Sequence, residues 1–299
     1  MNQKYLFKNT GVIIAGGKDL TDFLNRMSTN DLRNFRDGEY KKTVLTTDKG
    51  KIVDLIGIIN LSNLKILITS FDNQERVISH LNKYIIADDV TLEKPADKYL
   101  EMIVFTDNPE AVSSEILKTE ITKNTAAETE DKEYIFTDDF RLTVLNILIK
   151  KQDKDRLREK FKNYTELSIP DYEKIRIDAG IPEGRNELNE QINPLECGLG
   201  EYISYKKGCY IGQEVIARLD SQGKIPKVMV RINSDSRIES NSIISDEHEK
   251  EAGFISSVAQ TDIDYHALGF IRNTELDFRK EYFTTFNNKK TKLKIFKIN

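Results

Sequence analysis

The chain has 299 residues, which at about 100–200 residues per domain suggests two domains. Its 45 lysines and arginines are outnumbered by 49 aspartates and glutamates, and the net charge of −4 argues against a general nucleic-acid binder, because such proteins are basic. The longest apolar stretch, residues 55–61, is far shorter than the ~20 residues of a membrane span, so we expect a cytoplasmic protein with no direct nucleic-acid or membrane partner.

Strands and helices alternate along the first half of the chain. Apolar residues recur at the spacing of one helix face at Leu20, Phe23, Leu24 and Met27, which predicts a helix there. The turn formers of residues 48–50 lie between two β-rich runs and predict a hairpin. The same signals predict strands at 11–14, 42–47, 51–61, 64–70, 99–106, 134–137 and 141–150, helices at about 73–86, 111–119 and 154–164, and a polar loop at 120–132. The order lacks a strict βαβ period, which favours an α+β fold.

The pattern changes after Pro170. A helix is predicted at 172–179, ended by a glycine and a proline at 180–182. A polar, loop-like stretch follows, and a further helix is predicted from Ile211 to about residue 223. Beyond residue 225 only strand signals remain, at 227–233, 252–260, 267–273 and 292–298. The sequence therefore predicts a boundary between an α+β domain of residues 1–224 and a β-module of residues 225–299.

The chain carries few residues that could bind metal or form disulfides. Its cysteines are Cys197 and Cys209, and its histidines are His80, His248 and His266. Two cysteines cannot form a disulfide scaffold, and a structural zinc site would need two more ligands from scattered positions. We therefore expect no metal site.

Cys209 has the neighbours of a reactive thiol. Gly208 and Gly212 bracket it just before a predicted helix, and Lys206 and Lys207 precede it. Cations and a helix N-terminus both favour the thiolate. The alternative is a small buried cysteine that fills a tight turn, and the local residues alone slightly favour that reading. Cys197, among apolar and glycine neighbours, is predicted to be a packing residue.

The segment around Cys209 carries a family resemblance. Residues 207–214, Lys-Gly-Cys-Tyr-Ile-Gly-Gln-Glu, resemble the signature of the YgfZ family, folate-binding iron–sulfur maintenance proteins related to the glycine-cleavage T-protein, an aminomethyltransferase. Other segments resemble the family in the same order, at 17–31, 49–54, 176–182, 193–196, 253–257 and 267–272. The resemblance implies a T-protein-like fold, in which residues 1–224 form two sub-domains around a central folate funnel and residues 225–299 form a small β-barrel.

The resemblance also implies which residues hold the folate. Asp178 stands where the T-protein pattern has a glutamate that accepts the pterin 2-amino group and N3–H together. The aspartate is shorter, so the pterin or the helix would have to shift by about one C–C bond. Lys207 and Arg176 are the cations implied to meet the carboxylates of the folate tail. Without the resemblance, Arg176 would be read as a surface cation.

Three further residues complete the implied folate site. Asn30 and Asp54 would lie near the reactive edge of the cofactor, and Glu196 belongs to the loop that precedes the signature. Taken without the resemblance, Asn30 is more simply a helix terminator and Asp54 an acid at a strand edge. The implied cofactor is tetrahydrofolate or another reduced folate.

The residues at 54 and 55, after the predicted hairpin turn, distinguish the aminomethyltransferase pattern from the YgfZ pattern. Aminomethyltransferases usually carry two consecutive acids there, whereas Asp54 is followed by Leu55. The Cys209 signature belongs to the YgfZ pattern. The leading hypothesis is therefore a folate-dependent accessory protein for iron–sulfur cluster assembly or repair, whose partners are cluster enzymes such as the methylthiotransferases that modify tRNA, or assembly proteins. The alternatives are a tetrahydrofolate-dependent aminomethyltransferase and a folate-binding scaffold without chemistry, so catalysis itself is left open.

Overall fold

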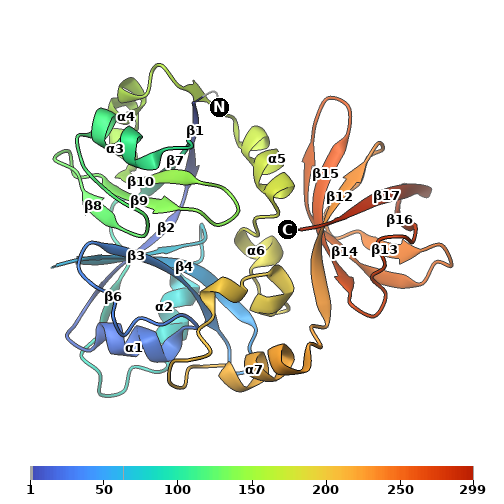
Figure 1. Ribbon diagram of the computed structural model, residues 1–299, viewed down its shortest axis with the longest axis horizontal. Helices are drawn as coiled ribbons and strands as arrows, with labels where there is room; N and C mark the ends of the chain where they lie inside the picture. The colour runs from blue at the N-terminus through green and yellow to red at the C-terminus, as the bar shows by residue number, and fades with distance from the viewer. Residues whose placement is uncertain (1–2, 63, 299) are drawn as a thin grey trace. The chain divides into compact units, whose positions relative to one another are not determined.

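The computed structural model describes residues 3–62 and 64–298 (Figure 1). Contacts divide the chain into two compact units. The first is Met1–Leu167 with Tyr202–Gln213, and the second is Ser168–Glu201 with Glu214–Asn299.

The first unit is built from two β-sheets and four α-helices among its described residues. The strands are β1 (Lys4–Asn9), β2 (Gly11–Gly16), β3 (Glu39–Thr46), β4 (Ile52–Leu61), β5 (Leu64–Thr69), β6 (Thr91–Glu93), β7 (Tyr99–Phe105), β8 (Ala126–Glu128), β9 (Tyr134–Asp138), β10 (Val144–Lys150) and β11 (Thr165–Glu166). The helices are α1 (Leu20–Met27), α2 (Gln74–Asn82), α3 (Pro109–Leu117) and α4 (Lys154–Lys160), the last preceded by a 3-10 turn at Lys151–Asp153. One sheet has the order β3-β4-β5-β2-β6 and the other β11-β1-β7-β10-β9-β8.

The two sheets of this unit face each other and the helices cover their outer faces. The rings of Tyr40 on β3 and Phe136 on β9 lie 4.3 Å apart between the sheets. On one outer face, α1 and α2 pack onto the β3–β4 side through residues such as Phe23. On the other, α3 and α4 cover β7 and β10, where Phe161 is buried. The apolar face predicted for residues 20–27 is thus the face that α1 buries.

The second unit consists of helices followed by a closed barrel. The helices are α5 (Ile169–Ala179), α6 (Gly184–Glu187) and α7 (Gln213–Gln222), with 3-10 turns at Pro194–Cys197 and Gly200–Tyr202. The barrel strands, orange to red in Figure 1, are β12 (Lys227–Ser234), β13 (Ile243–Asp246), β14 (Glu251–Gln260), β15 (Tyr265–Arg272), β16 (Tyr282–Phe286) and β17 (Lys289–Lys297). They close in the order β12-β15-β14-β13-β16-β17, and α5 packs on β14 and β15.

The predicted fold class, α+β with a small C-terminal β-barrel, is confirmed. Several local predictions differ from the structure. The polar segment 120–132 contains the short strand β8, and strands β1, β6, β11, β13 and β16 have no counterpart among the predicted strands. The predicted helix after the signature is present, but it begins at Gln213, two residues after Ile211. The predicted domain boundary near residue 225 lies two residues before β12 and stays a prediction. None of the helices in the described residues combines the length and apolar character that crossing a bilayer requires.

Candidate functional site

The residues singled out from the sequence fall in both units. The first unit carries Asn30, Asp54, Lys207 and Cys209, and the second carries Arg176, Asp178 and Glu196. Within the first unit, Lys207 contacts the backbone of Asn30 directly. Within the second, Arg176 and Asp178 share helix α5 but their side chains contact different partners.

The signature segment is anchored at both ends. Before it, the amide of Ser204 donates to the carbonyl oxygen of Thr29 at 2.9 Å. After Cys209, the hydroxyl of Thr46 donates to the carbonyl oxygen of Ile211 at 2.6 Å. Gly212 has a φ of +81°, and a Cβ there would lie 2.6 Å from the carbonyl oxygen of Thr47. The chain therefore needs a glycine where the segment passes against the β3–β4 hairpin.

Lys207 fastens this segment to the end of α1. Its side chain is buried, and Nζ donates to the carbonyl oxygens of Asn25, Ser28 and Asn30. The last carbonyls of a helix have no partner within the helix, and a cation satisfies both their hydrogen bonding and the helix dipole. Burial lowers the pKa of Lys207 to about 8. An ammonium group has three hydrogens, and here each of them is used by one backbone carbonyl oxygen. The predicted contact of Lys207 with a folate tail stays a prediction.

Cys209 is exposed, in contrast to its neighbours Lys207 and Tyr210, which are buried. A Cβ on the adjacent Gly208 would meet nothing within 4 Å, so the backbone here is open to solvent. Helix α7 begins four residues after Cys209, at Gln213. The field of a helix terminus falls off within its first turn. The N-terminus of α7 therefore contributes little to favouring the thiolate of Cys209. The exposed thiol itself agrees with the reactive reading and contradicts the buried one.

Asn30 holds the turn that follows α1. Its Nδ2 donates to the carbonyl oxygen of Lys42 at 2.7 Å, and its Oδ1 accepts from the amide of Asp31 at 2.8 Å. Hydrogen bonds from Arg33 hold the pKa of Asp31 at about 2. These contacts fit the helix-termination reading, and the role of Asn30 beside a cofactor stays a prediction.

Asp54 is fully buried and its carboxylate is surrounded by donors. It accepts from the amides of Leu55 and Ser70, from the Ser70 hydroxyl at 2.7 Å, and from Nδ2 of Asn73 at 2.9 Å. Burial raises the pKa of Asp54, and the hydrogen bonds from Asn73 and Ser70 offset only part of that effect. The group therefore ties β4 to the start of α2. Its proposed place at the reactive edge of a cofactor is untested.

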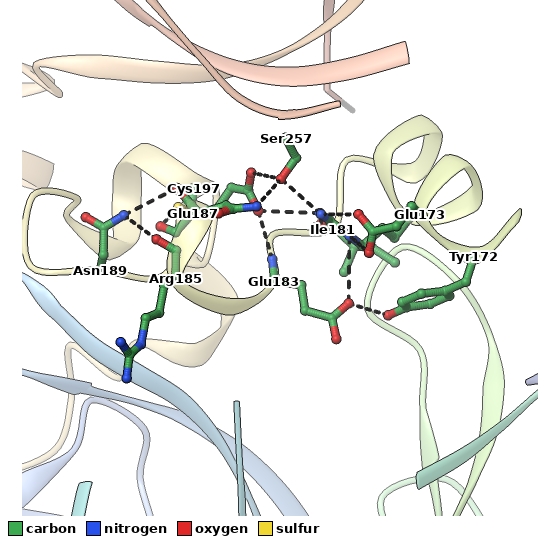
Figure 2. Close-up of polar contacts among 11 residues, drawn as sticks. Tyr172, Glu173, Ile181, Glu183, Arg185, Glu187, Asn189, Cys197 and Ser257 are labelled. Carbon is green, nitrogen blue, oxygen red and sulfur yellow. Dashed lines mark hydrogen bonds and ion pairs between the residues drawn. The ribbon is translucent and has the colours of Figure 1, made fainter. Parts of the chain in front are cut away.

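Arg176 is the centre of a buried ionic network in the second unit. Its guanidinium donates to Glu173 at 2.6 Å, to Glu187 at 3.4 Å and to the hydroxyl of Ser257 on β14 at 3.0 Å. The Ser257 hydroxyl donates in turn to Glu187 at 2.7 Å, and Figure 2 shows the carboxylates and the serine converging. Burial alone would lower the pKa of Arg176, but the bond to Glu173 and the charges of Glu187 and Glu173 outweigh it and raise that pKa.

This environment contradicts the surface-cation reading of Arg176. The side chain links α5, α6 and the barrel, and its donors face protein carboxylates. The predicted contact of Arg176 with a folate tail stays a prediction. The sequence analysis identified neither Glu187, which lies in no motif, nor Ser257, which ends the resembling segment 253–257, as a partner of Arg176.

Asp178 lies at the end of α5 against the barrel. Its Oδ1 lies 2.5 Å from Nδ1 of His266 on β15, and its Oδ2 accepts from Nζ of Lys174 at 2.6 Å. Nε2 of the same histidine lies 3.2 Å from Oδ1 of Asp264. About a third of the Asp178 side chain remains exposed, so the carboxylate is available to a ligand. His266 is a partner that the sequence did not reveal.

Glu196 and Cys197 lie together in the 3-10 turn of the second unit. Glu196 is buried and closes a capping box, because its carboxylate accepts from the amide of Asn193 at 2.7 Å. Cys197 is fully buried, and its thiol donates to the carbonyl oxygen of Glu187 at 3.6 Å. The prediction that Cys197 packs in the interior is confirmed. Within the described residues, no group of three or more histidine, cysteine or acidic side chains could hold a metal ion.

Comparison with known proteins gives relatives at low identity. No family model matches the chain. It is 23% identical to an aminomethyltransferase of Caldanaerobacter subterraneus over 71% of this chain and 61% of that protein. It is 27% identical to an Arabidopsis thaliana protein, named only as a chloroplastic transferase, over 88% of this chain and 63% of that one. The chain thus spans about three fifths of the length of these curated relatives.

A solved structure matches the fold of nearly the whole chain. The aminomethyltransferase T of the glycine cleavage system from Bartonella henselae superposes with a TM-score of 0.85 over 99% of this chain and 86% of that one, at 15% identity. At this identity the likeness concerns the fold. The chain therefore has the fold of the glycine-cleavage aminomethyltransferase T, and its own C-terminal strands close into a six-stranded β-barrel.

Proposed function

We propose that the protein binds a reduced folate, with tetrahydrofolate as the favoured form. The T-protein fold and the relatives named aminomethyltransferase support this proposal. So does Asp178, a partly exposed carboxylate whose two oxygens can accept the parallel 2-amino and N3–H donors of a pterin. Lys207 and Arg176 remain the cations proposed to meet the folate tail, and because both bind protein groups in this structure, each would have to share its donors with the tail carboxylates.

We further propose that the protein acts as an accessory factor for iron–sulfur cluster assembly or repair, in the manner of the YgfZ family. The presentation of Cys209 is the observation that carries this proposal. The thiol is exposed, while the segment is held in place on both sides of it. Lys207 is bound to three carbonyl oxygens and Gly212 is packed against the hairpin. Such a segment holds a nucleophilic sulfur toward solvent and toward a partner. The clients would be cluster enzymes, including those that methylthiolate tRNA.

Two cysteines are too few for a conventional cluster, which takes about four thiolates. Cys197 is moreover buried, which leaves Cys209 as the single exposed thiol of the described chain. A role for Cys209 in handling sulfur or a cluster edge on a client protein therefore fits better than a resident cluster.

An aminomethyltransferase is the second candidate function, and the names of the curated relatives favour it. Against it, Leu55 occupies the position of the second hairpin acid, and Asp54 is buried under four hydrogen bonds. Formation of methylene-tetrahydrofolate from an aminomethylated lipoyl carrier protein would establish this activity.

Calorimetric titration with tetrahydrofolate tests the binding proposal. The wild-type protein should bind tetrahydrofolate. Asp178→Asn should weaken binding by about 1–3 kcal/mol, because one of the two side-chain oxygens that accept from the pterin is replaced by an NH2 donor. No detectable binding at millimolar ligand would remove the folate proposal.

Complementation tests the accessory role. In a strain that lacks the gene, activity of cluster enzymes should be restored by the wild type and by Cys197→Ser, but not by Cys209→Ser. Should Cys209→Ser restore activity fully while folate still binds, the protein is better described as a folate-binding scaffold.

A further inference from the structure

We infer that His266 is the positioning residue for Asp178, the carboxylate proposed to bind the pterin edge. This inference rests on the proposed folate binding and names a residue that the sequence did not reveal. An ionised carboxylate is only an acceptor, so Nδ1 of His266 carries the proton in the 2.5 Å contact with Asp178. By the same reasoning Nε2 donates to Oδ1 of Asp264 at 3.2 Å, which holds the ring from its other side.

The environment fixes His266 on the barrel. The histidine is buried on β15, and the hydroxyl of Thr261 donates to both the carboxylate and the carbonyl oxygen of Asp264. That hydrogen bond, followed by the charge of His266, lowers the pKa of Asp264, so it faces the ring as an anion. The imidazole therefore has a single orientation in which Nδ1 faces α5.

The helix that bears Asp178 is tied to the same barrel. Arg231 on β12 donates to the backbone carbonyl oxygen of Asp178 at 2.7 Å, and Arg176 reaches Ser257 on β14. The backbone and the carboxylate of Asp178 are thus both held by barrel residues. An aspartate is shorter than the glutamate of the T-protein pattern, so its direction matters more for reaching a ligand.

The occupied contacts leave room for a ligand. A carboxylate offers about four lone-pair sites over its two oxygens. His266 uses one on Oδ1 and Lys174 one on Oδ2, which leaves one acceptor site on each oxygen. Two remaining sites on separate oxygens match two parallel donors, and a third of the side chain is exposed. His266 and Lys174 together set the plane of the carboxylate that those donors would meet.

Two substitutions of His266, one that keeps a donor at the position of Nδ1 and one that removes it, test this inference. In His266→Asn the amide NH2 can replace Nδ1–H, whereas His266→Phe keeps the ring shape and removes the donor. We expect His266→Phe to weaken tetrahydrofolate binding roughly tenfold, and His266→Asn to stay within about threefold of the wild type, the difference reflecting one hydrogen bond to a charged group. His248→Asn, at a histidine whose side chain is 82% exposed, is the matched control and should change nothing.

A double variant distinguishes positioning from simple structural support. In an Asp178→Asn background, His266→Phe should cause no further loss of folate affinity, because its effect acts through Asp178. If His266→Phe does not fold, Asp264→Asn, which changes the partner of Nε2, replaces it, with an expected loss of about threefold.

Each outcome decides a different statement. Folate binding by the wild type that His266→Phe leaves unchanged, or that His266→Asn weakens as much as His266→Phe, overturns the inference alone. Losses that add in the double variant also overturn it. Absence of folate binding by the wild type overturns the proposed function itself, and the inference with it.

Discussion

The ammonium group of Lys207 lies 2.7 Å from the carbonyl oxygen of Ser28, although 179 residues separate the two along the chain. The contact joins the signature segment to the C-terminal end of α1. It means that the lysine of the signature fixes the segment in place, and that the exposed thiol two residues later is presented by a rigid support.

Lys207→Met should destabilise the protein. The variant leaves the carbonyl oxygens of Asn25, Ser28 and Asn30 without this donor in a buried place, at a cost of about 1–3 kcal/mol in the free energy of unfolding. Urea unfolding measures the effect. The neighbouring Lys206 is exposed, so Lys206→Met is the control and should stay near the wild type. Equal stabilities for both variants would show that water replaces the ammonium group at no cost.

The same lysine predicts a pH dependence. Burial lowers the pKa of Lys207 to about 8 from its ordinary 10.5. Between these values the unfolded chain still holds the proton that the folded chain has released, so a rise in pH favours the folded state. The stability of the wild type relative to Lys207→Met should therefore increase from pH 8 to 10.5. A relative stability that decreases over that range would mean that the three carbonyls hold the charged form more strongly than burial disfavours it.

Local periodicity predicted the helices well where one face is buried within a single unit. Helix α1 spans Leu20–Met27, the same residues as its apolar pattern. The start of α7 was misplaced because Ile211 fits the helical spacing but packs, as a loop residue, against the core beneath α1. The sequence does not predict strands β6, β8 and β11, because a strand of two or three residues at a sheet edge needs little apolar sequence.

The partners of the site residues could not be predicted in this way. His266 and Asp178 are 88 residues apart, and Ser257 and Arg176 are 81 apart. Such contacts depend on how the barrel packs on α5, which no short pattern encodes. The family resemblance identified the positions of Asp178 and Cys209, but not that Lys207 and Arg176 would be committed to protein groups.

Arg176→Met should destabilise the second unit strongly. Removing the guanidinium leaves the carboxylates of Glu173 and Glu187 without their shared cation, and loss of one partner of a buried ion pair costs about 3–5 kcal/mol. Arg176→Lys should not restore stability, because an ammonium group lacks the planar fork that reaches several partners. Thermal unfolding gives the comparison. The exposed pair of Arg237 and Glu239 supplies a control, since Arg237→Met should cost at most about 1 kcal/mol.

Two glycines of the signature segment should respond differently to alanine. Gly212 has a positive φ, and a Cβ there would lie 2.6 Å from the carbonyl oxygen of Thr47 and 2.8 Å from Oγ1 of Thr46. Gly212→Ala should therefore cost about 1–3 kcal/mol and move the segment away from the hairpin. At Gly208 a Cβ meets nothing within 4 Å, so Gly208→Ala should leave the melting temperature unchanged. Identical melting temperatures for both variants would show that the segment adjusts without strain.

The two thiols should differ in reactivity in the folded protein. Cys209 is exposed, whereas Cys197 is fully buried and donates to the carbonyl oxygen of Glu187. A brief treatment with iodoacetamide at pH 7 should label Cys209 alone, and labelling of Cys197 should require unfolding, because a buried thiol reacts only when the structure opens. Mass spectrometry of tryptic peptides assigns the sites, with urea-unfolded protein as the reference in which both react. Comparable labelling of Cys197 in the native state would show that the 3-10 turn around it opens readily. If Cys209 reacts no faster than a free peptide thiol, its part in the proposed iron–sulfur role must come from its presentation to a partner and not from an activated sulfur.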